Sequence, residues 1–235
     1  MTEYHFKSIG IIESCFKQKF AIPRQPGLVP HATATIILEP EYSSEEIIRG
    51  LENFSHIWVI FVFHKSQIAK NKNTVRPPRL GGDKRMGVFA TRSNYRPNSI
   101  GQSVVKLVSI ENKDSKIKIK VSGGDFLDGT PVLDIKPYIP YVDVIPEASA
   151  NFAAHAPDKI FTVKIETNAL SQIEEASRLS GENIRLLVEE LLVYDPRPRH
   201  TQPDQHFVTQ LFNYDLKWKI EDTLVTVISF DHLPA

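Results

Sequence analysis

The chain has 235 residues, of which 41% are hydrophobic and 24% charged, and its formal net charge is zero. These values are ordinary for a soluble globular protein, and the length suits one large domain or a domain of about 150 residues with a smaller one. The longest apolar run, 57–63, is far too short for a membrane span, and residues 1–6 do not begin a signal peptide. The single cysteine, Cys15, excludes an internal disulfide framework, so we expect a cytoplasmic protein.

The first elements of the chain are a strand and a short helix. Residues 32–38 predict a strand that ends before Pro40. Ser43 and Glu46 have the spacing of a capping box and predict the start of a helix. Its apolar face would consist of Ile47, Ile48 and Leu51.

The middle of the chain predicts more strands. The β-branched and aromatic run at 57–63, IWVIFVF, predicts a strand that is buried on both faces. Residues 104–110 and 117–121 alternate between apolar and polar side chains, and 112–115 has the composition of a turn. These segments predict a hairpin with one face exposed to water.

The character of the sequence changes after about residue 144. A strand is predicted at 161–165, followed by two helices that Gly181 separates. The second helix has one apolar face, formed by Ile184, Leu187, Val188, Leu191 and Leu192. The proline-rich segment 195–199 ends it.

The chain ends in a predicted hairpin. Its first strand would carry Val208, Phe212, Tyr214, Leu216, Trp218 and Ile220 on one face. Glu221 and Asp222 form the turn that leads into the second strand at 224–230.

Positive charge is concentrated between residues 65 and 101. This stretch contains nine Lys or Arg residues and a single acid, Asp83, so the rest of the chain is correspondingly acidic. A local field of this sign attracts a polyanion such as nucleic acid, and the simpler alternative is a solvated loop. Asparagine, serine and threonine side chains between the charges offer hydrogen bonds, and Tyr95 offers a stacking face for a base.

Familiar nucleotide, metal and nucleophile motifs are missing from the sequence. No two glycines are separated by one residue, which excludes the dinucleotide fingerprint of a Rossmann domain. Residues 82–87 have the glycine spacing of a P-loop, but Val88 stands where the phosphate-binding lysine belongs. His56 and His64 would lie about 26 Å apart on one strand, too far to share a metal ion. Cys15 has no activating partner nearby in sequence.

Three polar loops remain as candidates for a binding site. They lie at 23–28, 91–101 and 125–138, and prolines and glycines punctuate each of them. Each loop alone reads as structural. Three of them in a chain of strands favour a rim that closes over a ligand at one end of a sheet or barrel.

These loops carry a family resemblance. Residues 86–93, 96–101 and 128–138 resemble the signature segments of the TsaA (YaeB) family, which includes the TrmO-type tRNA methyltransferases. Residues 9–12 with 23–27, and residues 54–64, are also similar to family segments. The resemblance covers roughly residues 4–146, and the region of 194–199 resembles the C-terminal extension of bacterial members.

The resemblance implies a fold and an activity. It implies a mainly β protein whose single β-barrel, not a Rossmann sheet, binds S-adenosylmethionine at residues 1–150, with a smaller C-terminal α+β domain at 151–235 that orients tRNA. It also implies a homodimer. The residues themselves predict no metal site. The reaction would methylate N6 of threonylcarbamoyladenosine beside the anticodon of threonine tRNA. Asn94 and Ser99 depart from the family, where proline is common at both positions.

The resemblance also assigns roles to individual residues. Cofactor-binding positions are Arg24, Gln25, Pro26, His64, Lys65, Arg92, Gln102, Asp128, Gly129, Thr130 and Pro131. Side-chain chemistry, and not the resemblance, makes Arg92 and Lys65 the candidates that stabilise negative charge as the acceptor nitrogen loses its proton. By the same reasoning Tyr95 either stacks on the base or packs on the rim of the barrel. RNA phosphates would meet Lys70, Lys72, Arg76, Arg79, Lys84, Arg85 and Arg96, with Arg197, Arg199 and His200 as a second group. The sequence assigns no general base.

Two other functions remain open at this point. A non-catalytic RNA-binding module would use the same basic loops without a tight S-adenosylmethionine site. A methyltransferase for a different acceptor would bind the cofactor and leave threonylcarbamoylated tRNA unmodified. A metal-dependent hydrolase is the least favoured alternative, since no metal-ligand spacing stands out.

Overall fold

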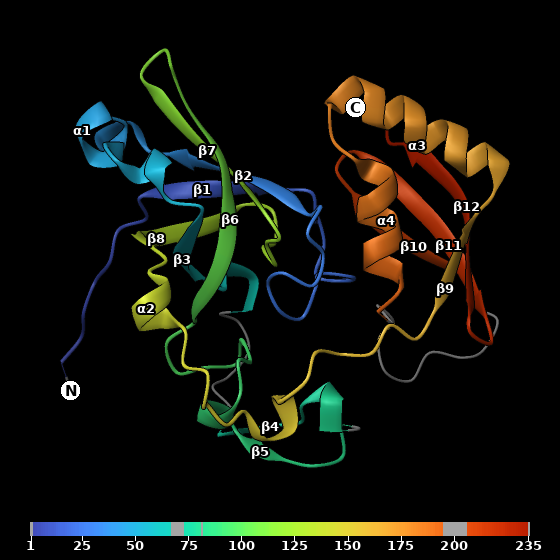
Figure 1. Cartoon of the computed structure of the whole chain (residues 1–235), viewed down its shortest axis with the longest axis horizontal. Coiled ribbons are helices and arrows are strands. Elements are labelled where there is room, and N and C mark those ends of the chain that lie inside the picture. Colours follow the sequence, from blue (N-terminus) through green and yellow to red (C-terminus); the bar gives the residue numbers. More distant parts are fainter. Residues whose placement is uncertain (1, 67–72, 81, 195–205, 235) are drawn as a thin grey trace. The chain divides into compact units, whose positions relative to one another are not determined.

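The computed structural model describes residues 2–66, 73–80, 82–194 and 206–234, and strands dominate it (Figure 1). Six strands close into a barrel, in the order β1, β2, β7, β6, β3, β8. Their bounds are β1 Gly10–Ser14, β2 Thr33–Leu38, β3 His56–Val62, β6 Ile100–Lys113, β7 Lys116–Ser122 and β8 Thr130–Pro137. The predicted barrel is therefore confirmed, as are the strand at 32–38 and the hairpin around 112–115.

Side chains fill the interior of the barrel. Alternate residues of each strand point inward because side chains of a strand alternate between its two faces. On β3 these are Ile57, Val59 and Phe61, which are at most 3% exposed. Trp58 and Ile60, on the other face, are only half-buried, so the prediction that this strand is buried on both faces was wrong. A binding site must therefore be built from the loops or the outer surface.

Short elements connect the barrel strands. The helices are α1 Glu45–Ile48 and α2 Pro140–Asp143, with 3-10 turns at Pro40–Tyr42, Leu51–Asn53, His64–Ser66, Pro78–Leu80, Val88–Ala90 and Asn151–Ala153. Two short strands, β4 Thr74–Val75 and β5 Met86–Gly87, pair with each other.

The predicted capping box was wrong. The N-cap of α1 is Ser44, and no side chain caps the helix. The Ser43 hydroxyl instead donates to the carbonyls of Leu38 and Glu39, at 3.2 and 3.1 Å, so it closes the turn after β2. The expected apolar face does not form either, since α1 ends at Ile48 and Ile47 is exposed.

The C-terminal region is a four-stranded sheet with two helices. Its elements are β9 Thr162–Ile165, α3 Thr167–Ser180, α4 Ile184–Leu192, β10 His206–Leu211, β11 Tyr214–Glu221 and β12 Leu224–His232. The strand order is β10, β11, β12, β9, with β9 parallel to β12. Residues of α3 and α4 share one core with the sheet, and Gly181 ends α3 with a positive φ of 73°, as predicted. The α+β character of this region is confirmed.

The predicted first strand of the final hairpin is two strands. Leu211 pairs with Tyr214, so Phe212 and Asn213 form a two-residue turn between β10 and β11. Phe212 has a φ of 52°, a conformation that aromatic residues rarely adopt, which is why the sequence did not indicate a turn. The proline-rich segment 195–199, predicted to stop the second helix, lies outside the described residues; α4 ends at Leu192.

The chain packs as two compact units that are discontinuous in sequence. One unit consists of residues 1–12, 36–119 and 130–156. The other joins residues 13–35 and 120–129 to the C-terminal region from residue 157 onward. We call residues 13–35 the strap. Several of its buried residues, among them Phe16, Ala21 and Val29, belong to the same hydrophobic core as α3 and α4.

No helix among the described residues is long and apolar enough to cross a membrane.

Candidate active site

The predicted cofactor loops leave the barrel at the same end. Ile12, near the end of β1, pairs with Thr130 at the start of β8. Val62, at the end of β3, pairs with Ile100 at the start of β6, and β3 and β8 are also antiparallel neighbours. The strap, the segment after β3, the loop before β6 and the loop before β8 therefore all attach at this end. The four loops carry every predicted cofactor residue except Gln102, Thr130 and Pro131, which lie in the first residues of the strands themselves.

Backbone hydrogen bonds join the strap to the loop before β8. The Gly27 N–H donates to the Gly123 carbonyl at 2.8 Å, and the Asp128 N–H donates to the Phe16 carbonyl at 2.8 Å. Gly27 and Gly123 have φ values of 79° and 75°, and a Cβ on Gly123 would lie 3.6 Å from the Gly27 Cα. Glycine at both positions is thus required by backbone conformation, and the turn 24–26 is fixed relative to the Asp128–Gly129 turn.

The Asp128 carboxylate is held in place by residues that follow β1. Its Oδ1 accepts from the Ser14 N–H at 2.8 Å and lies 2.9 Å from the Lys17 ammonium nitrogen. About a third of the Asp128 side chain remains exposed. The carboxylate is therefore oriented and partly neutralised, yet accessible to a ligand that donates hydrogen bonds. Thr130, two residues on, is buried at the start of β8.

The loop 88–96 is rigid because its own polar groups bond within it. The Thr91 hydroxyl donates to the Val88 carbonyl at 2.9 Å and accepts from the Ser93 N–H at 3.3 Å. Arg96 donates to the carbonyls of Val88 and Thr91, at 3.3 and 2.6 Å, and its guanidinium lies 5.8 Å from the centre of the Phe89 ring. Arg96, predicted to meet RNA phosphate, thus shapes its own loop.

The remaining predicted site residues between β3 and β6 lie in the 88–99 loop or in the strands and turns that adjoin it. The Phe63 N–H donates to the Ser99 carbonyl at 2.8 Å, so the chain leaves β3 next to the end of the 88–99 loop. Half-buried His64 and exposed Lys65 follow immediately. Arg92 is exposed and Tyr95 half-buried. Gln102 points to the outside of the barrel, since its neighbours on β6, Gly101 and Ser103, are buried.

Comparison with known proteins decides the family. The model of the tRNA-methyltransferase O N-terminal domain matches residues 11–144, and that of the TrmO C-terminal domain matches residues 158–233. This chain belongs to the TrmO family. The resemblance of the sequence to TrmO-type members is thereby confirmed.

Individual relatives of the TrmO family match nearly the whole chain. A tRNA (adenine(37)-N6)-methyltransferase from Escherichia coli K12 is 40% identical over 98% of this chain and 99% of its own. A protein from Pseudomonas aeruginosa PAO1, named a putative S-adenosylmethionine-dependent methyltransferase RcsF, is 44% identical over 89% of this chain and 90% of its own. A crystal structure of TrmO from Pseudomonas aeruginosa superimposes with a TM-score of 0.83 at 37% identity, covering 97% of this chain and 98% of that one.

The residues of this TrmO family member that were predicted to contact RNA differ in their surroundings. Arg76, Lys84 and Arg85 are exposed. Arg79 is exposed too, and its guanidinium donates to the His155 carbonyl. Five predicted RNA contacts lie outside the described residues, namely Lys70, Lys72, Arg197, Arg199 and His200. The described part of the chain contains no cluster of three or more His, Cys, Asp or Glu that would suit a metal ion.

Sequence reasoning missed the residues that hold the candidate site in place. Ser14, the last residue of β1, and Lys17 of the strap fix Asp128, and Glu190 of α4 binds His31 of the strap. Partners this far apart along the chain leave no periodic pattern in one sequence, so only their spatial proximity reveals them.

Proposed function

We propose that this chain is an S-adenosylmethionine-dependent tRNA methyltransferase that methylates N6 of threonylcarbamoyladenosine next to the anticodon of threonine tRNA in the cytoplasm. Membership of the TrmO family across both of its domains is the observation that carries the proposal. The E. coli relative is named for methylation at N6 of adenine 37, which supports the same acceptor atom here. Residues 1–150 would bind the cofactor, and residues 151–235 would orient the tRNA.

The residues at the loop end of the barrel suit S-adenosylmethionine. That molecule carries an amine, a carboxylate, ribose hydroxyls and an adenine ring. Arg24 is exposed on the strap and would pair with the carboxylate, while the partly exposed Asp128 would accept hydrogen bonds from the amine or a hydroxyl. Gly87 adjoins open space, since a Cβ built there meets no atom within 4 Å. His64, Lys65, Gln102 and Thr130 complete the proposed set with Gln25, Pro26, Arg92, Gly129 and Pro131.

The bound cofactor supplies a methyl group on a positively charged sulfur, and the protein needs no covalent nucleophile. Its main task is to hold the acceptor nitrogen in line with that methyl group, an effect worth about 7–11 kcal/mol in comparable reactions. The carbamoyl group makes the N6 proton of the acceptor more acidic. Exposed Arg92 and Lys65 would stabilise the negative charge that develops as this proton leaves.

Recognition of the RNA would rest on charge and stacking. A base beside the anticodon is already unpaired, so it can enter the site without the opening of a helix. Half-buried Tyr95, in the loop that Arg96 braces, would stack on it. The exposed side chains of Arg76, Lys84 and Arg85 would meet phosphates, with Arg79, Lys70, Lys72, Arg197 and Arg199 in support.

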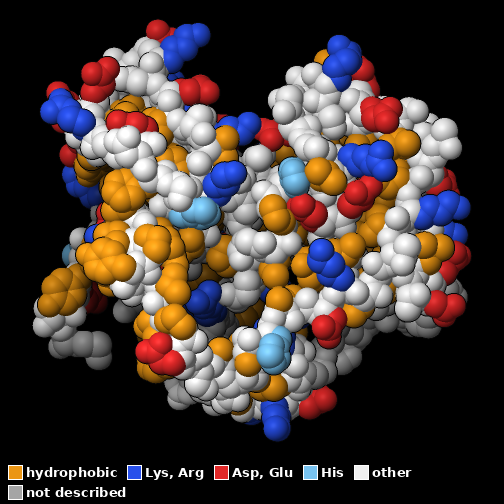
Figure 2. Space-filling view, viewed as in Figure 1, with side chains coloured by type: hydrophobic (Ala, Val, Ile, Leu, Met, Phe, Trp, Pro, Cys, Tyr) orange, Lys and Arg blue, Asp and Glu red, His pale blue; other side chains and the backbone are white. Residues whose placement is uncertain are grey.

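A homodimer is part of the proposal, and an exposed apolar surface supports it. Four side chains in and after α2 are more than half exposed, namely Tyr141, Val142, Val144 and Ile145. Hydrophobic side chains gather on the surface where α2 lies (Figure 2), and a patch of this kind favours an interface. Replacing Tyr141 and Val142 by serine is expected to shift the mass measured by light scattering from dimer to monomer. A wild-type monomer at micromolar concentration would contradict the dimer.

The decisive test of the activity is methyl transfer to natural tRNA. Bulk tRNA from cells that lack this protein is incubated with the protein and S-adenosylmethionine carrying a labelled methyl group, and the nucleosides are separated by mass. We expect the label on threonylcarbamoyladenosine. Cofactor binding with no labelled nucleoside would refute the acceptor, and failure to bind the cofactor would favour the RNA-binding module.

A pair of arginine variants tests the catalytic role of Arg92. Arg92→Ala is expected to lower kcat about 100-fold with little change in melting temperature. Arg49→Ala is the matched control, because Arg49 follows α1 on a connection from the opposite end of the barrel and is exposed. Full activity of Arg92→Ala would remove this residue from the site.

A further inference from the structure

We propose that the C-terminal domain positions the cofactor-binding turn 24–26 through the strap, and that His31 and Glu190 are positioning residues for S-adenosylmethionine binding. The inference rests on the proposed function, because it takes this turn to contact the cofactor. It gives the C-terminal domain a role in addition to the orientation of tRNA.

The strap is packed into the core of the C-terminal domain. Phe16, Ala21, Val29 and Ala32 are at most 7% exposed, and they share their core with α3, α4 and the sheet. The Phe20 ring lies parallel to the indole of Trp218, with 6.3 Å between the centroids. Apolar burial on this scale ties the strap to the domain by several side chains on both sides of the turn 24–26.

Backbone pairing continues the C-terminal sheet into the strap. Phe16 forms an antiparallel bridge with Leu211 of β10, and the Phe212 N–H donates to the Cys15 carbonyl at 2.8 Å. The Phe16 carbonyl also accepts the Asp128 N–H. One residue of the strap is therefore bonded both to the C-terminal sheet and to the second proposed cofactor loop.

A carboxylate of α4 holds the other end of the strap. Glu190 Oε2 accepts from the His31 main-chain N–H at 2.9 Å, and Oε1 lies 2.7 Å from His31 Nδ1. Because an ionised carboxylate only accepts hydrogen bonds, Nδ1 must carry a proton, whether the ring is neutral or charged. The bidentate arrangement fixes the ring and the backbone of His31 together, and we call these two contacts between Glu190 and His31 the clamp.

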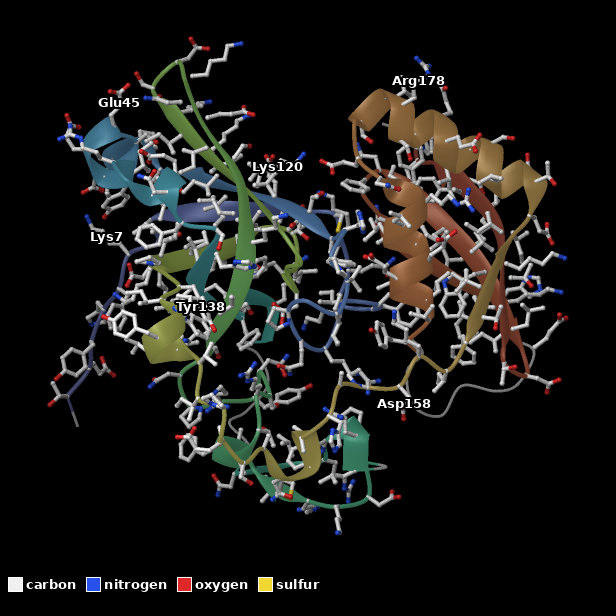
Figure 3. The ribbon with its side chains drawn as sticks, in the orientation of Figure 1. Lys7, Glu45, Lys120, Tyr138, Asp158 and Arg178 are labelled. Carbon is white, nitrogen blue, oxygen red and sulfur yellow. The ribbon has the colours of Figure 1, made fainter. Side chains whose placement is uncertain are left out.

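The segment between this clamp and the turn is stiff. Pro23, Pro26 and Pro30 restrict the backbone before His31, and Gly27 is bonded to Gly123. A displacement of His31 should therefore displace the turn 24–26 as well, because the segment between them has little freedom to bend. Lys120, which Figure 3 labels, ties the residues just before Gly123 to the same domain. Its ammonium nitrogen lies 2.7 Å from Oε1 of Glu182.

The test compares two neighbouring glutamates of α4 in the full-length protein. In Glu190→Gln the amide group presents N–H donors to one of the two His31 donors, so the clamp is broken with almost no change in volume. Glu189→Gln is the control, since Glu189 pairs with Arg185, 3.0 Å away on the same helix, and not with the strap. Calorimetry measures the Kd of S-adenosylmethionine, and filter binding measures the Kd of tRNA without cofactor.

We expect Glu190→Gln to raise the Kd and KM for S-adenosylmethionine about three- to tenfold, with the Kd for tRNA within twofold of the wild type. Glu189→Gln leaves both unchanged. Combining Glu190→Gln with His31→Ala adds little to either single change, because both remove the same clamp. A merely structural clamp would lower the melting temperature and leave the Kd for the cofactor in place.

Several results would overturn the inference. An unchanged Kd for S-adenosylmethionine in folded Glu190→Gln, with weaker tRNA binding, would confine the domain to RNA. If that variant fails to fold, Phe20→Leu loosens the strap at Trp218 instead, and an unchanged Kd there would be equally decisive. A wild-type protein that binds no S-adenosylmethionine would refute the proposed function itself, which the variants do not address.

Discussion

Gly101 ends a signature segment of the family, and we predict that it is required by packing and not by a ligand. It pairs with Phe61 across β3 and β6, and a Cβ built on it would lie 2.4 Å from two ring atoms of Phe61. That ring is 3% exposed, at the end of the filled barrel interior, and cannot swing into solvent. Overpacking of this kind costs about 1–3 kcal/mol.

Gly101→Ala should therefore lower the melting temperature by about 4–8 °C, for a loss of about 2 kcal/mol in a chain of this size. Differential scanning calorimetry measures the change. The control is Gly87→Ala in the preceding signature segment, where a Cβ meets nothing within 4 Å and φ is −55°, so stability should not change. An effect of Gly87→Ala on cofactor affinity alone would show close approach of a ligand there.

A second substitution tests the cause. Phe61→Leu removes the ring atoms that the new methyl group would strike, so the double variant should be more stable than the sum of the two single effects predicts, by about 1 kcal/mol or more. A melting temperature of Gly101→Ala within 1 °C of the wild type would refute the reasoning. Additive effects in the double variant would show that the strain lies elsewhere.

Four further predictions concern charge. Burial raises the pKa of the Cys15 thiol to about 12, so iodoacetamide at pH 8.5 should label it at least a hundredfold more slowly in the folded protein than in urea. The unfolded chain loses the thiol proton of Cys15 near pH 9, whereas the folded chain keeps it. The free energy of unfolding should therefore fall as the pH rises above about 9, by up to about 1.4 kcal/mol per pH unit. A Cys15→Ala variant measured alongside should lack this loss of stability. Replacing Lys84 and Arg85 by glutamine should reduce the slope of log K for tRNA against log salt by about 1.5, and an unchanged slope would remove them from the RNA surface. Asp128→Asn keeps the acceptor for Ser14 but loses the ion pair with Lys17, so calorimetry should show weaker binding of S-adenosylmethionine with a stability change of at most about 1 kcal/mol.

The sequence predicted those parts of the fold that local periodicity determines. The alternation in 117–121 and the apolar face from Ile184 to Leu192 both correspond to observed elements, because side-chain spacing alone decides which face is buried. Phe212 shows the limit of such patterns. A turn that places an aromatic residue at positive φ is stabilised by the pairing of β10 and β11, and that pairing has no local signature.

The candidate site was predicted through motifs, whereas its supports were not. Loops rich in glycine, proline and arginine predicted a ligand-binding rim, and Gly27 and Gly123 do adopt backbone conformations that favour glycine. The motif suggested that Arg96 faces RNA, but its guanidinium bonds to two carbonyls of its own loop. A cationic residue in a sequence indicates that it attracts an acceptor or an anion, and only the structure shows which group it contacts.

The bridge between Phe16 and Leu211 joins residues that lie far apart along the sequence, and this has a consequence for biosynthesis. During translation the strap leaves the ribosome before β10 has been synthesised. Phe16, Phe20 and Val29 therefore stay exposed to solvent until their packing partners are made. Contacts between residues so distant along a chain slow folding and expose sticky intermediates. A nascent chain halted before α3 would thus expose these apolar side chains to chaperones and proteases.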